Sequence, residues 1–204
     1  MLTIWGRINS HNVKKLLWFA DEIGLPYDRR DVGGQFGFPA DYVAKNPNKL
    51  IPTVEEDGLV LWESNAILRY LAAKYAPGTA FWPVDHAARA VGDKWMDWQI
   101  GYADTQRTMF MQMVRVAPEN RDAEAIAASL KQATALMVIL NGALEKTRWL
   151  SGAAFGLGDI PMGCYVNSWF QLEIERPDLP ALEDWYDRLK SRPAYAEHVM
   201  IPLS

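Results

Sequence analysis

The segment of residues 46–66, which reads NPNKLIPTVEEDGLVLWESNA, constrains the fold of this chain more than any other. An Asp57-Gly58 pair divides it into two runs that are rich in apolar and β-branched residues. Asp-Gly between such runs is a strong signal for a β-hairpin. Apolar residues then recur at helical spacing over 66–74, so we expect a helix directly after the hairpin.

The two ends of this hairpin carry features that suit a ligand. Pro52 begins the first strand, and the backbone before such a proline stays unpaired and able to accept an extended peptide. At the other end, Ser64 or Asn65 can cap the following helix. The N–H groups at a helix N-terminus and its positive dipole suit a carboxylate. The hairpin therefore predicts a peptide contact at one end and an anion contact at the other.

The residues before the hairpin predict alternating strands and helices. We expect a strand over 2–5, a helix over 13–23, a strand over 27–32 and a short helix over 38–45. With the hairpin and its helix, these elements give the order β-α-β-α-β-β-α, which resembles thioredoxin. We therefore predict an α/β thioredoxin-like domain over residues 1–76.

The remainder of the chain predicts helices only. A Pro- and Gly-rich segment without periodicity separates it from the first domain, and we place the linker at 77–86. Two apolar stripes at helical spacing follow, over 91–116 and 126–144, and two further helices are expected over 160–174 and 182–189. These patterns predict an all-α helical domain over 87–204.

Charge and cysteine content exclude several classes of protein. The net charge of −4 argues against nucleic acid or an anionic membrane as the main partner. The single cysteine, Cys164, rules out an internal disulfide and fits a reducing compartment. We see no window of about 18 apolar residues and no signal peptide. We therefore expect a cytoplasmic protein without a transmembrane helix.

The pattern Asn-Pro-x-x-x-Ile-Pro, a hairpin, and then Glu-Ser-Asn-Ala-Ile resembles the glutathione site of cytosolic glutathione transferases. The resemblance spans nearly the whole chain and implies that Pro52 is cis. It also implies that the backbone of Ile51 pairs with the cysteinyl part of glutathione, and that Glu63 and Ser64 hold the γ-glutamyl end. The alternative is an ordinary hairpin-to-helix connection in which Glu63 and Ser64 only cap the helix.

The same resemblance implies a thiol-activating hydroxyl after the first strand. Ser10 falls on the serine position of theta- and zeta-like classes, and Ser10-x-Asn12 resembles the Thr-x-Asn of a bacterial nu-like class that prefers disulfide reduction. We assign Ser10, and second Asn12, to the glutathione thiolate; the alternative is that Ser10 only caps the first helix. Lys49 is expected near the glycine carboxylate of glutathione, with a solvated lysine as the alternative.

The helical domain is expected to supply the second substrate's pocket. Methionine adapts to varied shapes, so we place Met109 and Met113 in an apolar pocket for an electrophile. Near 156–159 the family has a Ser/Thr-x-x-Asp capping box. This chain keeps Asp159 but has Gly156 at the hydroxyl position, so we expect Asp159 to act in folding. The histidines lack metal spacing, and no metal is expected.

These observations predict a homodimeric glutathione transferase that conjugates glutathione to small hydrophobic electrophiles in detoxification. Glutathione is expected as a co-substrate, with no cofactor. Two alternatives stay open: a glutathione-dependent disulfide reductase with a similar site, and a non-catalytic ligand-binding protein of the same fold. A scaffold domain of a larger complex is a weaker option.

Overall fold

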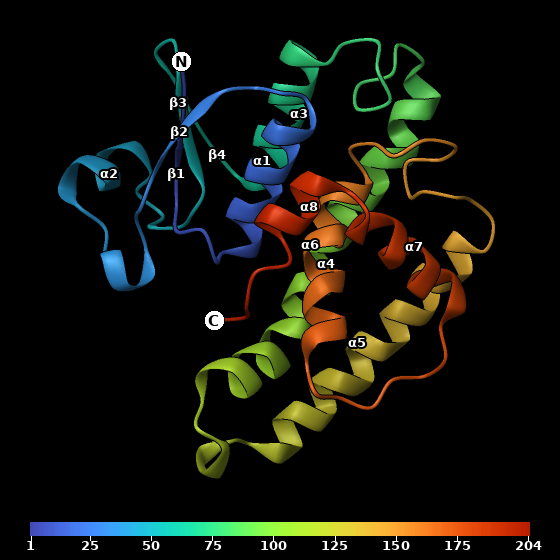
Figure 1. The fold of residues 1–204 in the computed structure, drawn as a ribbon. Helices are drawn as coiled ribbons and strands as arrows, with labels where there is room; N and C mark the ends of the chain where they lie inside the picture. Colours follow the sequence, from blue (N-terminus) through green and yellow to red (C-terminus); the bar gives the residue numbers. More distant parts are fainter.

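In a computed structural model that describes residues 1–204, the N-terminal part of the chain forms a mixed sheet with helices on both faces (Figure 1). Its elements are β1 (Leu2–Trp5), α1 (His11–Glu22), β2 (Tyr27–Arg30), η1 (Gly34–Phe36), α2 (Ala40–Lys45), β3 (Thr53–Glu56), β4 (Leu59–Trp62) and α3 (Ser64–Tyr75). The strand order is β2-β1-β3-β4, with β2 parallel to β1 and with β3 and β4 added antiparallel. The expected order β-α-β-α-β-β-α is confirmed.

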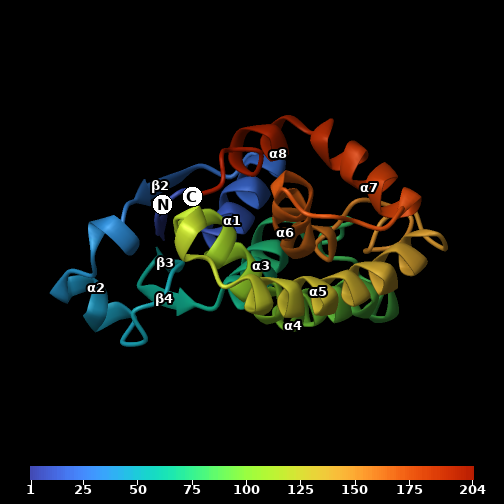
Figure 2. The same ribbon diagram turned by 90° about the horizontal axis from the view of Figure 1, so that it is seen from below.

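The alternation of side chains along the strands gives the sheet two apolar faces. Leu2 and Ile4 of β1 are buried in the main core together with residues of α1 and α3. Trp5 faces the other way and packs with Val32 and Tyr42 under α2. Helix α2 therefore lies across the sheet from α1 and α3 (Figures 1 and 2).

The C-terminal part is helical, as expected. Its elements are α4 (His86–Arg115), η2 (Pro118–Asn120), α5 (Ala123–Leu144), α6 (Asp159–Gln171), α7 (Pro180–Lys190) and α8 (Pro193–His198). Helices α4 and α5 lie side by side, and α6 lies between this pair and α1 (Figures 1 and 2). Residues 159–169 of α6 are buried throughout. Helix α6 therefore joins the two parts of the chain through one continuous core.

Helix α6 begins around the carboxylate of Asp159. This group is fully buried and accepts hydrogen bonds from the N–H groups of Leu150 (2.8 Å) and Gly156 (3.1 Å) and from the indole of Trp185 (3.0 Å). Ser151 replaces the hydroxyl that is missing at position 156. Its Oγ accepts a hydrogen bond from the N–H of Gly158, just before the helix, at 2.9 Å. The contacts of Asp159 are those of a folding residue.

Two expectations about individual helices were wrong. Neither Ser64 nor Asn65 caps α3: the helix begins at Ser64, and Glu63 takes the cap position at φ 73° without a side-chain hydrogen bond. No apolar window of about 18 residues was expected, yet α5 contains an 18-residue window with a mean hydropathy of 1.4 and passes a length and composition test for a membrane span. Polar residues interrupt the apolar run of α5, so the sequence contains no continuous apolar segment of this length. A single helix of this kind is weak evidence for a membrane span.

Candidate active site

A cleft of 460 Å³ lies where the N-terminal domain meets α4 and α6. Its walls come from the start of α1, the end of the hairpin, the middle of α4 and Tyr165 of α6. Four residues predicted from the sequence line this cleft, namely Ser10, Asn12, Glu63 and Ser64. The fold therefore gathers segments that are more than 50 residues apart in the chain.

Ser10 precedes the first turn of α1. Its carbonyl accepts the N–H groups of Val13 (3.0 Å) and Lys14 (2.9 Å), but its hydroxyl makes no capping hydrogen bond. Ser10 therefore occupies the N-cap position of α1, as the alternative interpretation expected, but it does not cap the helix through its side chain. Its hydroxyl lies in the wall of the cleft without a partner in the chain.

Asn12 and Ser64 connect the first helix to the third. The hydroxyl of Ser64 donates to Asn12 Oδ1 at 3.3 Å, and Ser64 is the first residue of α3. Glu63 is exposed at the rim, immediately before the helix. The N-terminus of α3 thus opens into the same cleft as Ser10, which is the arrangement that an anionic group requires.

Lys15 is a cleft residue that the sequence reading missed. Its ammonium donates to Ser64 Oγ (3.1 Å), to Asn65 Oδ1 (3.1 Å) and to Gln99 Oε1 (2.6 Å), and its side chain is buried. Burial lowers the pKa of Lys15 to about 7. The spacing in the sequence indicates this position, because Lys15 follows Asn12 by three residues and both therefore lie on one face of α1.

His11 forms an aromatic wall beside Ser10. Its ring stacks on Tyr165 at 4.6 Å and meets the edge of Phe110 at 5.0 Å, and Nε2 is hydrogen bonded to Ser168 Oγ. Burial, and then the neighbouring lysines and arginines, lower the pKa of His11 to about 3. The imidazole is therefore neutral at pH 7.

The residues expected at the hairpin's start lie beside the cleft and do not line it. The Ile51–Pro52 bond is cis, as the resemblance implied. The N–H and C=O of Ile51 take part in none of the backbone hydrogen bonds outside helices and strands. Lys49 is exposed with φ 53°, and Leu50, the residue after it, lines the cleft.

The two predicted methionines do not reach the cleft. Met109 is completely buried in the core, and Met113 packs against that core. The stripe that contains them is the more apolar face of α4, and this face turns toward the helical core. Another face of α4 lines the cleft instead, and its apolar residues there are Ile100, Ala103, Phe110 and Met111.

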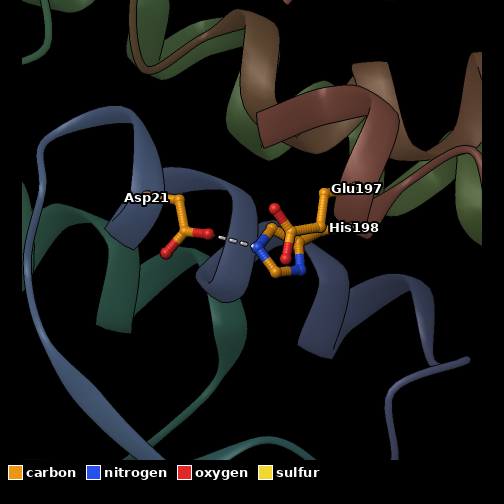
Figure 3. Close-up of side chains that lie close together, drawn as sticks. All are labelled: Asp21, Glu197 and His198. Carbon is orange, nitrogen blue, oxygen red and sulfur yellow. Dashed lines mark hydrogen bonds and ion pairs between the residues drawn. The ribbon is translucent and has the colours of Figure 1, made fainter. Parts of the chain in front are cut away.

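One group of possible metal ligands lies at the contact of α1 with α8, formed by Asp21, Glu197 and His198 (Figure 3). Their ligand atoms lie within 4.8 Å of one another. His198 Nε2 and Asp21 Oδ2 are hydrogen bonded directly at 2.5 Å. This geometry is that of an interhelical contact, and none of the three residues lines the cleft.

A thioredoxin-like sheet, a helical domain and a polar cleft between them define the class of protein. Models of the glutathione S-transferase N-terminal and C-terminal domains match residues 1–73 and 103–193. The chain is 44% identical over the full length of both proteins to glutathione S-transferase GstB of Escherichia coli K12. It therefore belongs to the glutathione S-transferase family, and it is an enzyme of that family.

Two further relatives bear on the chemistry. The theta class glutathione S-transferase of Xanthomonas axonopodis pv. citri, solved with glutathione bound, has a TM-score of 0.95 and 48% identity, covering 100% of this chain and 99% of the other. The disulfide-bond oxidoreductase YfcG of E. coli K12 is 30% identical over 93% of this chain and 90% of its own length.

Proposed function

We propose that this transferase binds glutathione in the cleft, extended from Ile51 to Ser64, with the sulfur beside Ser10. The observation that carries this proposal is the meeting of Ser10 with Ser64 and Lys15 in one cleft. The bound glutathione in the related Xanthomonas structure supports it. Glutathione acts here as a co-substrate.

The γ-glutamyl group is assigned to the N-terminus of α3. Its carboxylate accepts hydrogen bonds from Ser64 and from the N–H groups of the first helical turn, with the charge of Lys15 behind them. Its ammonium lies against the exposed carboxylate of Glu63. This arrangement pairs every charge of the γ-glutamyl group with an opposite charge of the chain.

The cysteinyl group is assigned to the backbone before Pro52. Because the N–H and C=O of Ile51 are not used within the fold, they can hydrogen bond the ligand backbone as an added strand would. The glycine carboxylate then extends toward Lys49, which is exposed and has no ion pair within the chain.

Ser10 is assigned to thiolate stabilisation, with Asn12 next to it. A free thiol has a pKa of about 8.5, and lowering it by about two units requires about 2.7 kcal/mol. A hydrogen bond to the charged sulfur supplies about 1.5–3 kcal/mol, and the N-terminus of α1 about 0.3–1 kcal/mol more. The hydroxyl needs only to prefer the anion, and it need not act as a base.

The thiolate then attacks a small electrophile in the half of the cleft lined by α4. Conjugation to carbon is the main proposal because the chain resembles named transferases over its full length. Disulfide reduction is the second candidate, favoured by Asn12 beside Ser10 and by the 30% identity to YfcG.

One pair of assays separates these candidates. Turnover of a chloronitrobenzene acceptor with glutathione supports conjugation, whereas turnover of a small disulfide alone supports reduction. In either case, Ser10→Ala is expected to lower the rate severely. An unchanged rate in Ser10→Ala would remove Ser10 from the mechanism and leave the family assignment intact.

We also propose a cytoplasmic homodimer that acts in detoxification. Large apolar side chains are exposed on β4, the edge strand of the sheet, namely Leu59, Val60 and Trp62. An exposed apolar edge strand favours aggregation in a monomer, whereas a subunit interface buries its apolar side chains. Light scattering of the wild type and of Trp62→Lys tests this, with a shift of the variant toward the monomer as the expected result.

A further inference from the structure

Gln106 has an amide group without a partner in the wall of the cleft. The side chain is 1% exposed, and neither Nε2 nor Oε1 makes a hydrogen bond within the chain. Buried amides in folded proteins almost always have a hydrogen-bond partner. Both amide atoms are buried in this side-chain conformation, but Gln106 is one of the residues that line the cleft, so a rotation of its side chain brings the amide to a molecule that occupies the cleft.

Gln106 lies in the half of the cleft that the electrophile is proposed to use. Phe110 follows it by one helical turn on α4 and packs against His11, the neighbour of Ser10. Ala103 precedes it by three residues and also lines the cleft. Gln106 therefore lies on the same face of α4 as Ala103 and Phe110, and this face lines the cleft.

This half of the cleft also has an excess of positive charge. Arg7, Arg107 and Arg115 line it, against the single carboxylate of Asp104. None of these arginines forms an ion pair with a carboxylate side chain in the chain, although Arg115 donates to the main-chain oxygen of Ser204 at 3.2 Å. Arg7 donates to Asn9 Oδ1 at 2.5 Å, and Arg115 lies close enough to lower the pKa of Arg7, after burial.

Glutathione does not account for these groups. In the proposed binding mode, its γ-glutamyl charges meet Lys15 and Glu63, and its glycine carboxylate extends toward Lys49. The arginines and Gln106 are then left to the second substrate. A guanidinium fork and an amide N–H both match the planar oxygens of a carboxylate.

We propose that the second substrate of this enzyme is a small electrophile that carries a carboxylate, held by Gln106 and by the arginines around it. This inference rests on the proposed glutathione site. It replaces the purely apolar pocket expected from the sequence with one in which Ile100, Phe110 and Met111 contact the carbon frame while the polar groups fix its orientation.

The reaction at such a substrate is a substitution. The glutathione thiol first loses its proton to solvent, and the thiolate donates an electron pair to the carbon that bears a halide. The sulfur–carbon bond forms, the carbon–halogen bond breaks, and the halide leaves with its bonding pair. The carboxylate takes no part in bond making and serves to hold the substrate.

Two matched substrates test the proposal, 4-chloro-3-nitrobenzoate and its neutral amide, 4-chloro-3-nitrobenzamide. Each kcat/KM is divided by the rate constant of the uncatalysed reaction with glutathione, so that the difference in intrinsic reactivity is removed. We expect the carboxylate to be favoured by tenfold or more. Arg7→Gln is expected to reduce that preference.

Gln106→Leu tests the amide itself, with Gln132→Leu, an exposed residue of α5, as the matched control. We expect Gln106→Leu to lower kcat/KM for the benzoate about tenfold, and less for the benzamide, while the KM for glutathione changes less than twofold. Because the variant removes an unpartnered buried amide, its melting temperature should equal or exceed that of the wild type. The control should match the wild type throughout.

Three outcomes would overturn the inference. Equal or better turnover of the benzamide contradicts the carboxylate. Equal losses on both substrates in Gln106→Leu contradict the contact, and a large fall in its melting temperature identifies a structural role. In each of these cases glutathione still binds in a calorimetric titration. If it does not bind, the proposed function fails as well, and the two failures are thus distinguished.

Discussion

The ammonium of Lys15 lies 3.1 Å from the hydroxyl oxygen of Ser64, inside the protein, and forms no ion pair. A buried charge without a counter-charge is unfavourable. Burial accordingly lowers the pKa of Lys15, against the smaller opposing influences of Cys164 and then Glu63. A carboxylate that binds at the start of α3 supplies the missing negative charge.

Lys15→Met is therefore expected to weaken glutathione binding by about 1.5–3 kcal/mol, the typical worth of a hydrogen bond to a charged group. Calorimetric titration measures this, with Lys131→Met on the exposed part of α5 as the control. The unliganded variant should be no less stable than the wild type, because the buried cation is removed. Wild-type affinity in Lys15→Met would exclude Lys15 from the site.

The stability of the unliganded protein should rise with pH between about 7 and 10.5 because of Lys15. The folded pKa is about 7, below the reference value of 10.5. The unfolded state thus binds more protons in this window, and the free energy of unfolding increases with pH, by at most about 1.4 kcal/mol per unit.

Urea unfolding of the wild type and of Lys15→Met at a series of pH values tests this slope. The difference between the two curves isolates the contribution of Lys15 to the pH dependence from that of its titratable and charged neighbours. These neighbours are His11 and Lys14 on α1, Glu63 before α3, and Cys164 and Tyr165 on α6. Parallel curves would contradict the lowered pKa.

Glu63→Ala and Ser64→Ala should each weaken glutathione binding. Glu63 is assigned to the ligand ammonium and Ser64 to its carboxylate, and a hydrogen bond or ion pair at such a position is worth about 1 kcal/mol or more. Glu173→Ala, an exposed glutamate after α6, serves as the control. Unchanged affinity in both site variants would remove the γ-glutamyl assignment.

Gly156→Ser, which restores the capping box of the family, should destabilise this chain. A Cβ at position 156 would lie 2.6 Å from the carbonyl oxygen of Ala80 and 2.9 Å from Ser151 Oγ. We expect Gly156→Ser to lower the free energy of unfolding by about 1–3 kcal/mol. Ser151→Ala is expected to lower it by about 1 kcal/mol. Thermal unfolding measures both, and a stabilised Gly156→Ser would contradict the substitute role of Ser151.

Local patterns were enough to predict the strands, the helices α1 to α7 and four residues of the cleft, but not the short elements η1, η2 and α8. Ser10, Asn12, Glu63 and Ser64 lie at the starts of helices, where short motifs indicate both the structure and the proposed ligand contact. Lys15 was missed because a lysine beside another lysine resembles a solvated pair, although this one is buried.

The wall formed by α4 could not be read from the sequence. Met109 belongs to the most apolar stripe of that helix, and such a stripe faces the core whenever a core is available. Gln106 looks ordinary in the sequence, and its importance comes from an amide that the folded chain leaves without a partner. Only the packing of α4 against α5 and α6 reveals which of its faces remains open.

The ultraviolet difference absorption of bound glutathione tests thiolate stabilisation by Ser10, because it reports occupancy of the cleft and thiolate formation together. At neutral pH, the wild type should show thiolate absorption. Ser10→Ala should bind glutathione but lose most of that signal, since the hydroxyl in the cleft wall is gone. An undiminished thiolate signal in Ser10→Ala, or none in the wild type at saturating glutathione, would contradict the account.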